Sequence, residues 1–231
     1  MKFLVFDSGP IINLAINNLL EVLEDLKKRY NGEFLIPRKV KEELVNRPLE
    51  GTKFKFEALR TLSFINKGII KTIDDKEIEL AALEFKQLVN QCFRKNGKNI
   101  EIIHQGEAEA IMTAKMMNAE AIVIDESTAR MLIEEPEMYL HRLENKLNAK
   151  IIKDEKKLRE LKEITKGLVI LRSTEIITIA YKIGLLDKYL PERIPMAKRV
   201  LLESVLWALK LNGCSITNKE INRIVKKESR D

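Results

Sequence analysis

Residues 106–130 read GEAEAIMTAKMMNAEAIVIDESTAR and decide the fold. Apolar residues recur at helical spacing in the first half of this stretch, which predicts a helix over residues 105–117. The apolar run AIVI at 121–124 predicts a short strand buried on both faces, and Asp125 follows it directly. A helix that leads through a short turn into an apolar strand is the repeating unit of a parallel sheet.

The same strand–helix alternation extends to both sides of this stretch. Four more apolar segments predict strands at residues 2–6, 34–36, 69–73 and 167–171. Helices are expected between and after them, at residues 8–16, 19–29, 38–46, 52–66, 76–93, 127–147 (interrupted at Pro136), 154–165, 174–183, 195–211 and 218–227. The sequence therefore predicts an α/β fold with a central parallel sheet of about five strands.

The chain contains no internal repeat, low-complexity segment or flexible linker. A single domain over residues 1–231 is expected, with a charged helical insertion near 134–166 and C-terminal helices at 195–228. The insertion includes DEKKLRELKEITK and could form a protruding helical hairpin.

Composition indicates a basic globular protein and argues against a membrane-spanning or zinc-binding one. Of the 231 residues, 45% are hydrophobic, which is enough for a sizeable core. The net charge of +6 and the pI of about 9.1 slightly favour a polyanionic partner such as RNA or DNA over an ordinary basic surface. Cys92 and Cys214 match no motif, and without a secretory leader they indicate a cytoplasmic protein. No apolar run is long enough to span a membrane. With only His104 and His141, a zinc site is not expected.

Four carboxylates stand at strand ends or on the helices that follow them: Asp7, Glu43, Glu107 and Asp125. Because the carboxyl ends of parallel strands share one edge of the sheet, sites form there and these side chains are expected to converge. Carboxylates are the ligands that hard divalent ions prefer, so the pattern predicts bound Mg²⁺ or Mn²⁺. Such ions serve the hydrolysis of phosphodiesters.

Three segments carry a family resemblance: VFDSGPIINLA at 5–15, IPRKVKEELV at 36–45, and residues 106–130. Together they resemble the PIN domain, a family of metal-dependent nucleases, over roughly residues 1–186. The resemblance implies a three-layer α/β/α fold and a Mg²⁺- or Mn²⁺-dependent endoribonuclease that cuts single-stranded or structured RNA with a metal-activated water. It also implies Asp7, Glu43, Glu107 and Asp125 as the catalytic and metal-binding set.

Small members of the family are the toxin halves of toxin–antitoxin pairs, so an antitoxin-like protein partner is one expectation. A homodimer is another, with the apolar segment VLLESVLWALKL at 200–211 as its candidate interface. More commonly, the apolar face of such a helix packs against the core of its own domain.

Two ligand choices stay open in the sequence. Glu42 competes with Glu43, which is preferred because it directly precedes the apolar Leu44, as in the family motif. Glu109 competes with Glu107, which is preferred for its spacing to Asp125; Glu109 lies about 200° further around the helix and is kept as an additional metal ligand. Glu126 is a possible auxiliary ligand or a charge at a helix start.

Substrate contacts are expected from five further side chains: Ser8, Asn13, Arg38, Arg130 and Ser173. Ser8, Asn13 and Ser173 could bind substrate or only serve the helix ends, as could Thr174. Arg38 and Arg130 could meet phosphates or form ordinary surface pairs. Cations near the acids are expected to bind the RNA backbone: Arg38, Lys39, Lys41, Lys53, Lys55 and Arg130.

Other families fit less well. A haloacid-dehalogenase-like phosphatase needs a second Asp two residues after the first, where this chain has Gly9. A receiver domain needs a Lys that is not evident, and DSGPII lacks the glycines of a dinucleotide-binding loop. The serious alternative is a catalytically silent PIN-like module that binds RNA or protein.

Overall fold

The computed structural model describes residues 1–228. Its core is a five-stranded parallel sheet in the order β3-β2-β1-β6-β8. The strands are β1 (Lys2–Phe6), β2 (Gly32–Pro37), β3 (Ile70–Ile73), β6 (Ala121–Val123) and β8 (Ile170–Leu171). The predicted parallel sheet of about five strands is therefore confirmed.

The strands form where the sequence is apolar on both faces. Val5 and Phe6 at the centre of the sheet are fully buried, as are Ile36 and Ile122 on neighbouring strands. Val5 pairs with Leu35 on one side and with Ile122 on the other. This alignment brings the carboxyl ends of β1, β2 and β6 to the same edge of the sheet.

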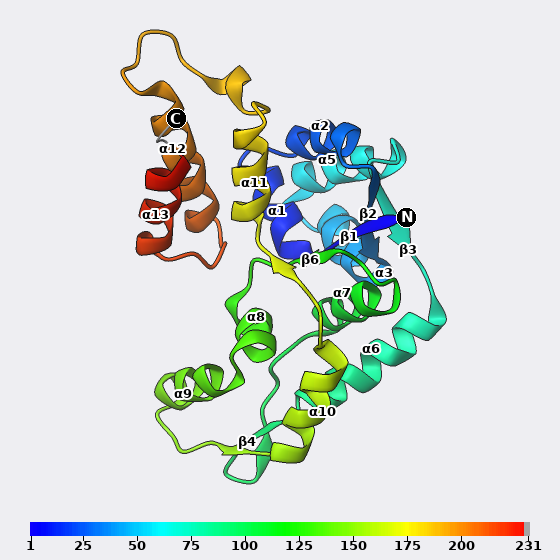
Figure 1. Ribbon diagram of the computed structural model, residues 1–231. Helices are drawn as coiled ribbons and strands as arrows, with labels where there is room; N and C mark the ends of the chain where they lie inside the picture. The colour runs from blue at the N-terminus through cyan, green and yellow to red at the C-terminus, as the bar shows by residue number, and fades with distance from the viewer. Residues whose placement is uncertain (229–231) are drawn as a thin grey trace.

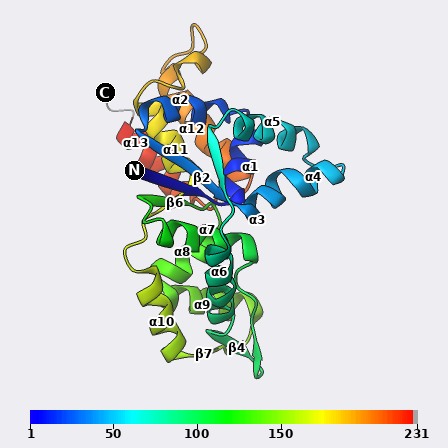
Figure 2. The same cartoon turned by 90° about the vertical axis from the view of Figure 1, so that its right-hand side faces the viewer.

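Helices cover both faces of the sheet (Figures 1 and 2). One layer contains α7 (Gln105–Met116), which packs against β1, β2 and β6 and is backed by α6 (Lys76–Val89). The opposite layer contains α1 (Ser8–Ile16), α2 (Glu21–Arg29), α5 (Lys55–Asn66) and α11 (Ser173–Lys182). The architecture is the predicted three-layer α/β/α arrangement.

A second, smaller sheet lies at the far end of the α6–α7 layer and was not predicted. It has the order β5-β4-β7, built from β4 (Phe93–Lys95), β5 (Lys98–Asn99) and β7 (Ile152–Lys153). The predicted helix over 76–93 was wrong at its end: α6 ends at Val89, and Phe93 begins β4, where its ring lies 5.6 Å from that of Tyr139.

The charged segment predicted as an insertion is folded onto the domain. It follows α8 (Ser127–Glu134) and holds all of α9 (Pro136–Leu147), then β7 and α10 (Glu155–Thr165). Leu158 and Leu161 of α10 are buried, and α10 packs against α6. The segment does not form an isolated helical hairpin, because β7, which lies between its two helices, pairs with β4 of the domain.

The helix predicted over residues 38–46 has an unforeseen break in its regularity. It runs as α3 (Arg38–Lys41), then a π-helical turn η1 (Glu42–Asn46), then α4 (Arg47–Glu50). Across the π turn the Arg47 amide donates to the Glu42 carbonyl, five residues earlier. Single π turns inside helices are frequent at functional sites.

The C-terminal part adds a short 3₁₀ turn η2 (Asp187–Tyr189) and two packed helices, α12 (Ala197–Leu211) and α13 (Asn218–Glu228) (Figure 1). Their shared core contains Leu202, Leu206, Ile216 and Ile221, with Trp207 partly buried against it. The apolar face proposed for dimerisation is thus covered by α13, and the homodimer itself stays a prediction. Among the described residues, no helix has both the length and the apolar character needed to cross a bilayer.

Candidate metal and nuclease site

A pocket of about 730 Å³ opens at the carboxyl ends of the central strands. Five carboxylates line it: Asp7, Glu43, Glu107, Asp125 and Glu126. The four acids singled out in the sequence therefore converge on one cavity. Lys39 and Arg47 are the cations of its lining. The other lining residues are Ser8, Gly9, Ile12, His104, Gln105, Ser127, Asn212, Gly213 and Ser215.

Asp7 follows the last residue of β1 and is only 5% exposed. Its backbone amide continues the sheet by donating to the Val123 carbonyl at 3.0 Å, and its Oδ2 accepts a long bond of 3.5 Å from the Gly9 amide. Its other oxygen, Oδ1, is buried and has no hydrogen-bond partner. Burial, with the charge of Glu43 as a smaller cause, raises the pKa of Asp7 to about 7.

Glu107 sits in the first turn of α7 and is 7% exposed. One oxygen, Oε2, caps its own helix by accepting from the His104 amide at 2.9 Å, while the buried Oε1 has no partner. Burial raises the pKa of Glu107 to about 8, and the nearby charges of Glu126 and Asp7 add to the effect. The capping role therefore leaves one oxygen of Glu107 available for a ligand.

Glu43 reaches the pocket from the π-helical turn, and the space for it depends on a glycine. A Cβ on Gly106 would lie 2.6 Å from Glu43 Oε1, so only glycine lets this carboxylate lie against the start of α7. The rival Glu42 points elsewhere: it pairs with Lys39 Nζ at 2.7 Å, and that contact lowers its pKa. The geometry thus favours Glu43 over Glu42.

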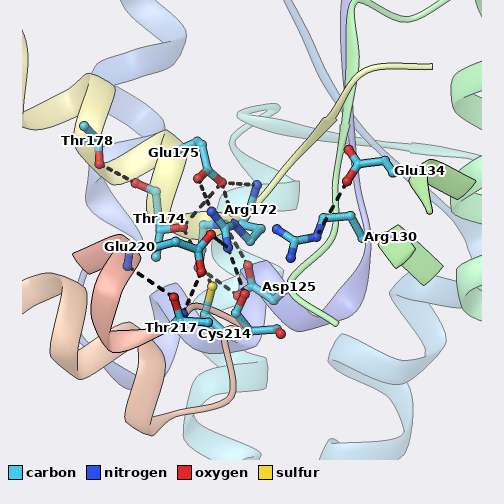
Figure 3. Close-up of polar contacts among 12 residues, drawn as sticks. Asp125, Arg130, Glu134, Arg172, Thr174, Glu175, Thr178, Cys214, Thr217 and Glu220 are labelled. Atoms are coloured by element: carbon cyan, nitrogen blue, oxygen red, sulfur yellow. Dashed lines mark hydrogen bonds and ion pairs between the residues drawn. The ribbon is translucent and has the colours of Figure 1, made fainter. Parts of the chain in front are cut away.

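Asp125 follows β6 and is held by three hydrogen bonds (Figure 3 draws its surroundings). Its Oδ1 accepts from the Ser173 amide at 2.7 Å, and its Oδ2 accepts from the Ser173 hydroxyl at 2.7 Å and from Asn13 Nδ2 at 2.9 Å. Asn13 and Ser173 are almost fully buried. They therefore orient Asp125 and are not placed to touch a substrate.

The C-terminal helices are fastened to this edge of the sheet by a largely buried arginine. Arg172, 7% exposed, donates to Glu175 at 2.6 Å, to Glu220 of α13 at 3.0 Å and to the Ser215 carbonyl at 2.9 Å (Figure 3). The Ser215 amide in turn donates to the Asp125 carbonyl at 2.9 Å. These bonds hold the loop between α12 and α13 as one wall of the pocket.

A comparison with models of protein families shows to which family the chain belongs. The family model DUF3368, described as a PIN domain, matches residues 3–142. The chain belongs to the PIN domain family. Neither curated proteins nor solved structures gave a match.

Several residues predicted for the PIN site lie outside the pocket lining. Glu109 is buried on the neighbouring side of α7, where its Oε2 accepts from the Lys39 amide at 3.0 Å and so caps α3. This placement does not support Glu109 as a metal ligand. Arg38 pairs with Glu42 and Glu79, and Arg130 lies nearest to Glu134, at 3.8 Å. Of the five predicted substrate contacts, only Ser8 lines the pocket.

The sequence reading missed part of the lining of this PIN pocket. His104, Gln105 and Ser127 adjoin the predicted acids, so proximity in sequence was an available signal. Asn212, Gly213 and Ser215 lie outside the residues matched by the family model, and no sequence pattern links them to the acids. Only the fold brings this C-terminal loop to the site.

The donor set fits a hard divalent ion in its chemistry. Five carboxylates share one open pocket, and the buried oxygens Asp7 Oδ1 and Glu107 Oε1 are without partners. Within residues 1–228, however, no three His, Cys, Asp or Glu side chains are already arranged to hold an ion together. The fit therefore rests on the ligand chemistry and the two unpaired oxygens, and binding would require carboxylate side chains to turn.

Proposed function

We propose that this protein is a divalent-metal-dependent endoribonuclease, using Mg²⁺ or Mn²⁺ to hydrolyse RNA phosphodiesters. One observation carries the proposal: two buried carboxylate oxygens, Asp7 Oδ1 and Glu107 Oε1, lack partners in a pocket shared with three more acids. Buried polar atoms normally have a hydrogen-bond partner, so two neighbouring carboxyl groups that each have an oxygen without one suggest that a ligand binds between them. Membership of the PIN domain family supplies the nuclease class.

The roles follow from how each carboxylate is held. Asp7, Glu107 and Glu43 would hold the ion, because each presents a carboxylate to the pocket. Asp125, fixed by Asn13 and Ser173, would supply a rigid negative charge beside them. A bound divalent ion offers positive charge to phosphate oxygens and lowers the pKa of a water molecule.

The protein's own groups prepare the site in two ways. The raised pKa values of Asp7 and Glu107 mean that these acids hold protons near neutral pH until a cation favours their ionised forms. Lys39 and Arg47 line the same pocket and offer positive charge to the phosphates of an incoming strand. These two cations reduce the electrostatic repulsion between the carboxylates and the phosphates of the RNA.

The test is a cleavage assay with end-labelled single-stranded and hairpin RNAs in Mg²⁺, Mn²⁺ or EDTA. We expect cleavage only with metal, with 3′-hydroxyl and 5′-phosphate products, because water rather than the ribose 2′-hydroxyl is the nucleophile. Asp7→Asn and Glu107→Gln should abolish cleavage, while Glu84→Gln, an exposed acid on α6, should leave it intact. Cleavage that continues in EDTA, or that leaves a 2′,3′-cyclic phosphate, would reject the mechanism.

A second candidate is a PIN-like module that binds RNA without cutting it. It is favoured by the absence of a preformed three-residue ion site among residues 1–228 and by the full engagement of both Asp125 oxygens. RNA binding in EDTA with no cleavage at millimolar Mn²⁺ would select this alternative.

A further inference from the structure

An exposed segment that alternates lysine and phenylalanine lies after α4 and runs into the first turn of α5. It consists of Lys53, Phe54, Lys55 and Phe56, called here the KFKF segment. The ring of Phe54 is 39% exposed and that of Phe56 is 69% exposed. Two phenylalanines this exposed within three residues of chain are unusual, because aromatic side chains gain most by burial.

The lysines of the KFKF segment have no acidic partner within residues 1–228. Lys53 Nζ stands 4.9 Å from the centroid of the Phe54 ring, a cation–π contact. Within residues 1–228, neither Lys53 nor Lys55 forms an ion pair, whereas Lys39 and Arg38 are both paired with Glu42. The segment thus presents two aromatic faces and two uncompensated positive charges to solvent.

The backbone of Phe54 is strained. Its φ of +60° and ψ of +20° place it in the left-handed region, where a side chain crowds the backbone. A bulky residue in this region is a true outlier, and glycine or asparagine would fit better. Such strain is found preferentially at ligand-binding sites. Phe54 remains 39% exposed, so burial of its side chain offsets only part of this strain.

The KFKF segment continues directly from the wall of the pocket. Arg47, the first residue of α4, lines the pocket, and Phe54 follows seven residues later, at most about 25 Å away. Figure 2 shows α4 at the edge of the molecule, with α5 next to it. A strand bound at the acids could therefore run past Arg47 and reach the two rings.

We propose that the KFKF segment is a stacking platform for unpaired bases of the substrate, with Phe54 and Phe56 under the bases and Lys53 and Lys55 on the phosphates. Aromatic rings beside cations are the chemistry that binds single-stranded nucleic acid, because every base has a face to stack. A duplex hides those faces. The inference rests on the proposed function and adds to it a second binding surface, outside the acidic pocket, for the unpaired bases of the substrate.

The test measures binding by the full chain in EDTA, so that no cleavage occurs. The probes are a labelled oligouridine of about 12 nucleotides and a duplex of equal length. Phe56→Ala should weaken oligouridine binding about 5- to 100-fold, in line with the loss of one stacked base, and should scarcely change duplex binding. Leu80→Ala removes an equally exposed apolar side chain from α6 and should change neither.

Phe54→Asn separates binding from folding. Asparagine tolerates the left-handed backbone, so the Tm should stay level or rise while oligouridine affinity falls. Unchanged affinity in both phenylalanine variants would overturn the proposal. So would a dimer in sedimentation that Phe56→Ala converts to monomer without loss of RNA affinity. Because these assays need no catalysis, a failed cleavage assay leaves the platform standing, and cleavage without ring dependence rejects the platform alone.

Discussion

Replacing Asp7 by Asn should make the apo protein more stable at neutral pH. Burial is the main cause that raises the pKa of Asp7 from 3.8 to about 7. Below about pH 3 the carboxyl is protonated in both the folded and the unfolded chain and does not affect stability. As the pH rises towards 7, the unfolded chain ionises while the folded chain keeps the proton, so the free energy of unfolding falls.

The size of this effect follows from the pKa change. At 1.36 kcal/mol per pH unit, raising the pKa from 3.8 to about 7 costs the fold about 4 kcal/mol above pH 7. Asn keeps the shape of the side chain and can still accept the bond from the Gly9 amide. Glu107, whose pKa is raised to about 8, is present in both proteins, but the charge of Asp7 contributes to that rise, so the comparison reports the burial of Asp7 together with its repulsion of Glu107.

Urea denaturation from pH 4 to 8.5 in EDTA measures the difference. The advantage of Asp7→Asn should be near zero at pH 4, grow to a few kcal/mol by pH 7.5 and then level off. In saturating Mn²⁺ the order should reverse, because only the parent keeps the full ligand set. A difference between the two proteins that does not vary with pH would refute the reasoning.

Three further predictions probe the framework of the site. Gly106→Ala places a Cβ 2.6 Å from Glu43 Oε1, so it should displace that carboxylate and reduce cleavage at least about tenfold with little change in Tm, as for other contacts that orient metal ligands; normal activity would contradict this. Arg172→Met leaves Glu175 and Glu220 without their shared partner and should cost about 3 kcal/mol in urea unfolding, whereas a loss below 1 kcal/mol would show that the clamp is unimportant. Glu109→Gln should lower stability by about 1 kcal/mol by weakening the cap of α3 yet retain cleavage, while Glu107→Gln should abolish it; equal loss in both would restore Glu109 as a ligand.

The sequence predicted most of the fold because its strands are short, apolar and separated by clear helix signals. Asp7 and Asp125 follow the central strands β1 and β6, so parallel pairing alone brings them to one edge. The end of α6 at Val89 was not predicted, because Phe93 belongs to β4 and packs against Tyr139, which is distant in the sequence. Local pattern gives no signal for such a contact.

The choice among neighbouring acids shows where sequence reasoning about the site ends. Spacing favoured Glu43 and Glu107, and the structure turns both into the pocket. Spacing in the sequence could not reveal that Glu109 caps α3, or that Asn13 and Ser173 donate hydrogen bonds to Asp125. These roles depend on partners that are distant in sequence, as does the wall formed by Asn212 and Ser215.

Calorimetric titration of Mn²⁺ at pH 6.5, in two buffers of different ionisation enthalpy, tests the central claim most directly. Asp7 and Glu107 have pKa values of about 7 and about 8, so both are largely protonated at this pH. Binding one ion between them should release between about one and two protons, which the two buffers would report as different heats. Asp7→Asn should weaken binding and reduce the proton release. Absence of binding at millimolar Mn²⁺, or binding with no proton release, would contradict the account.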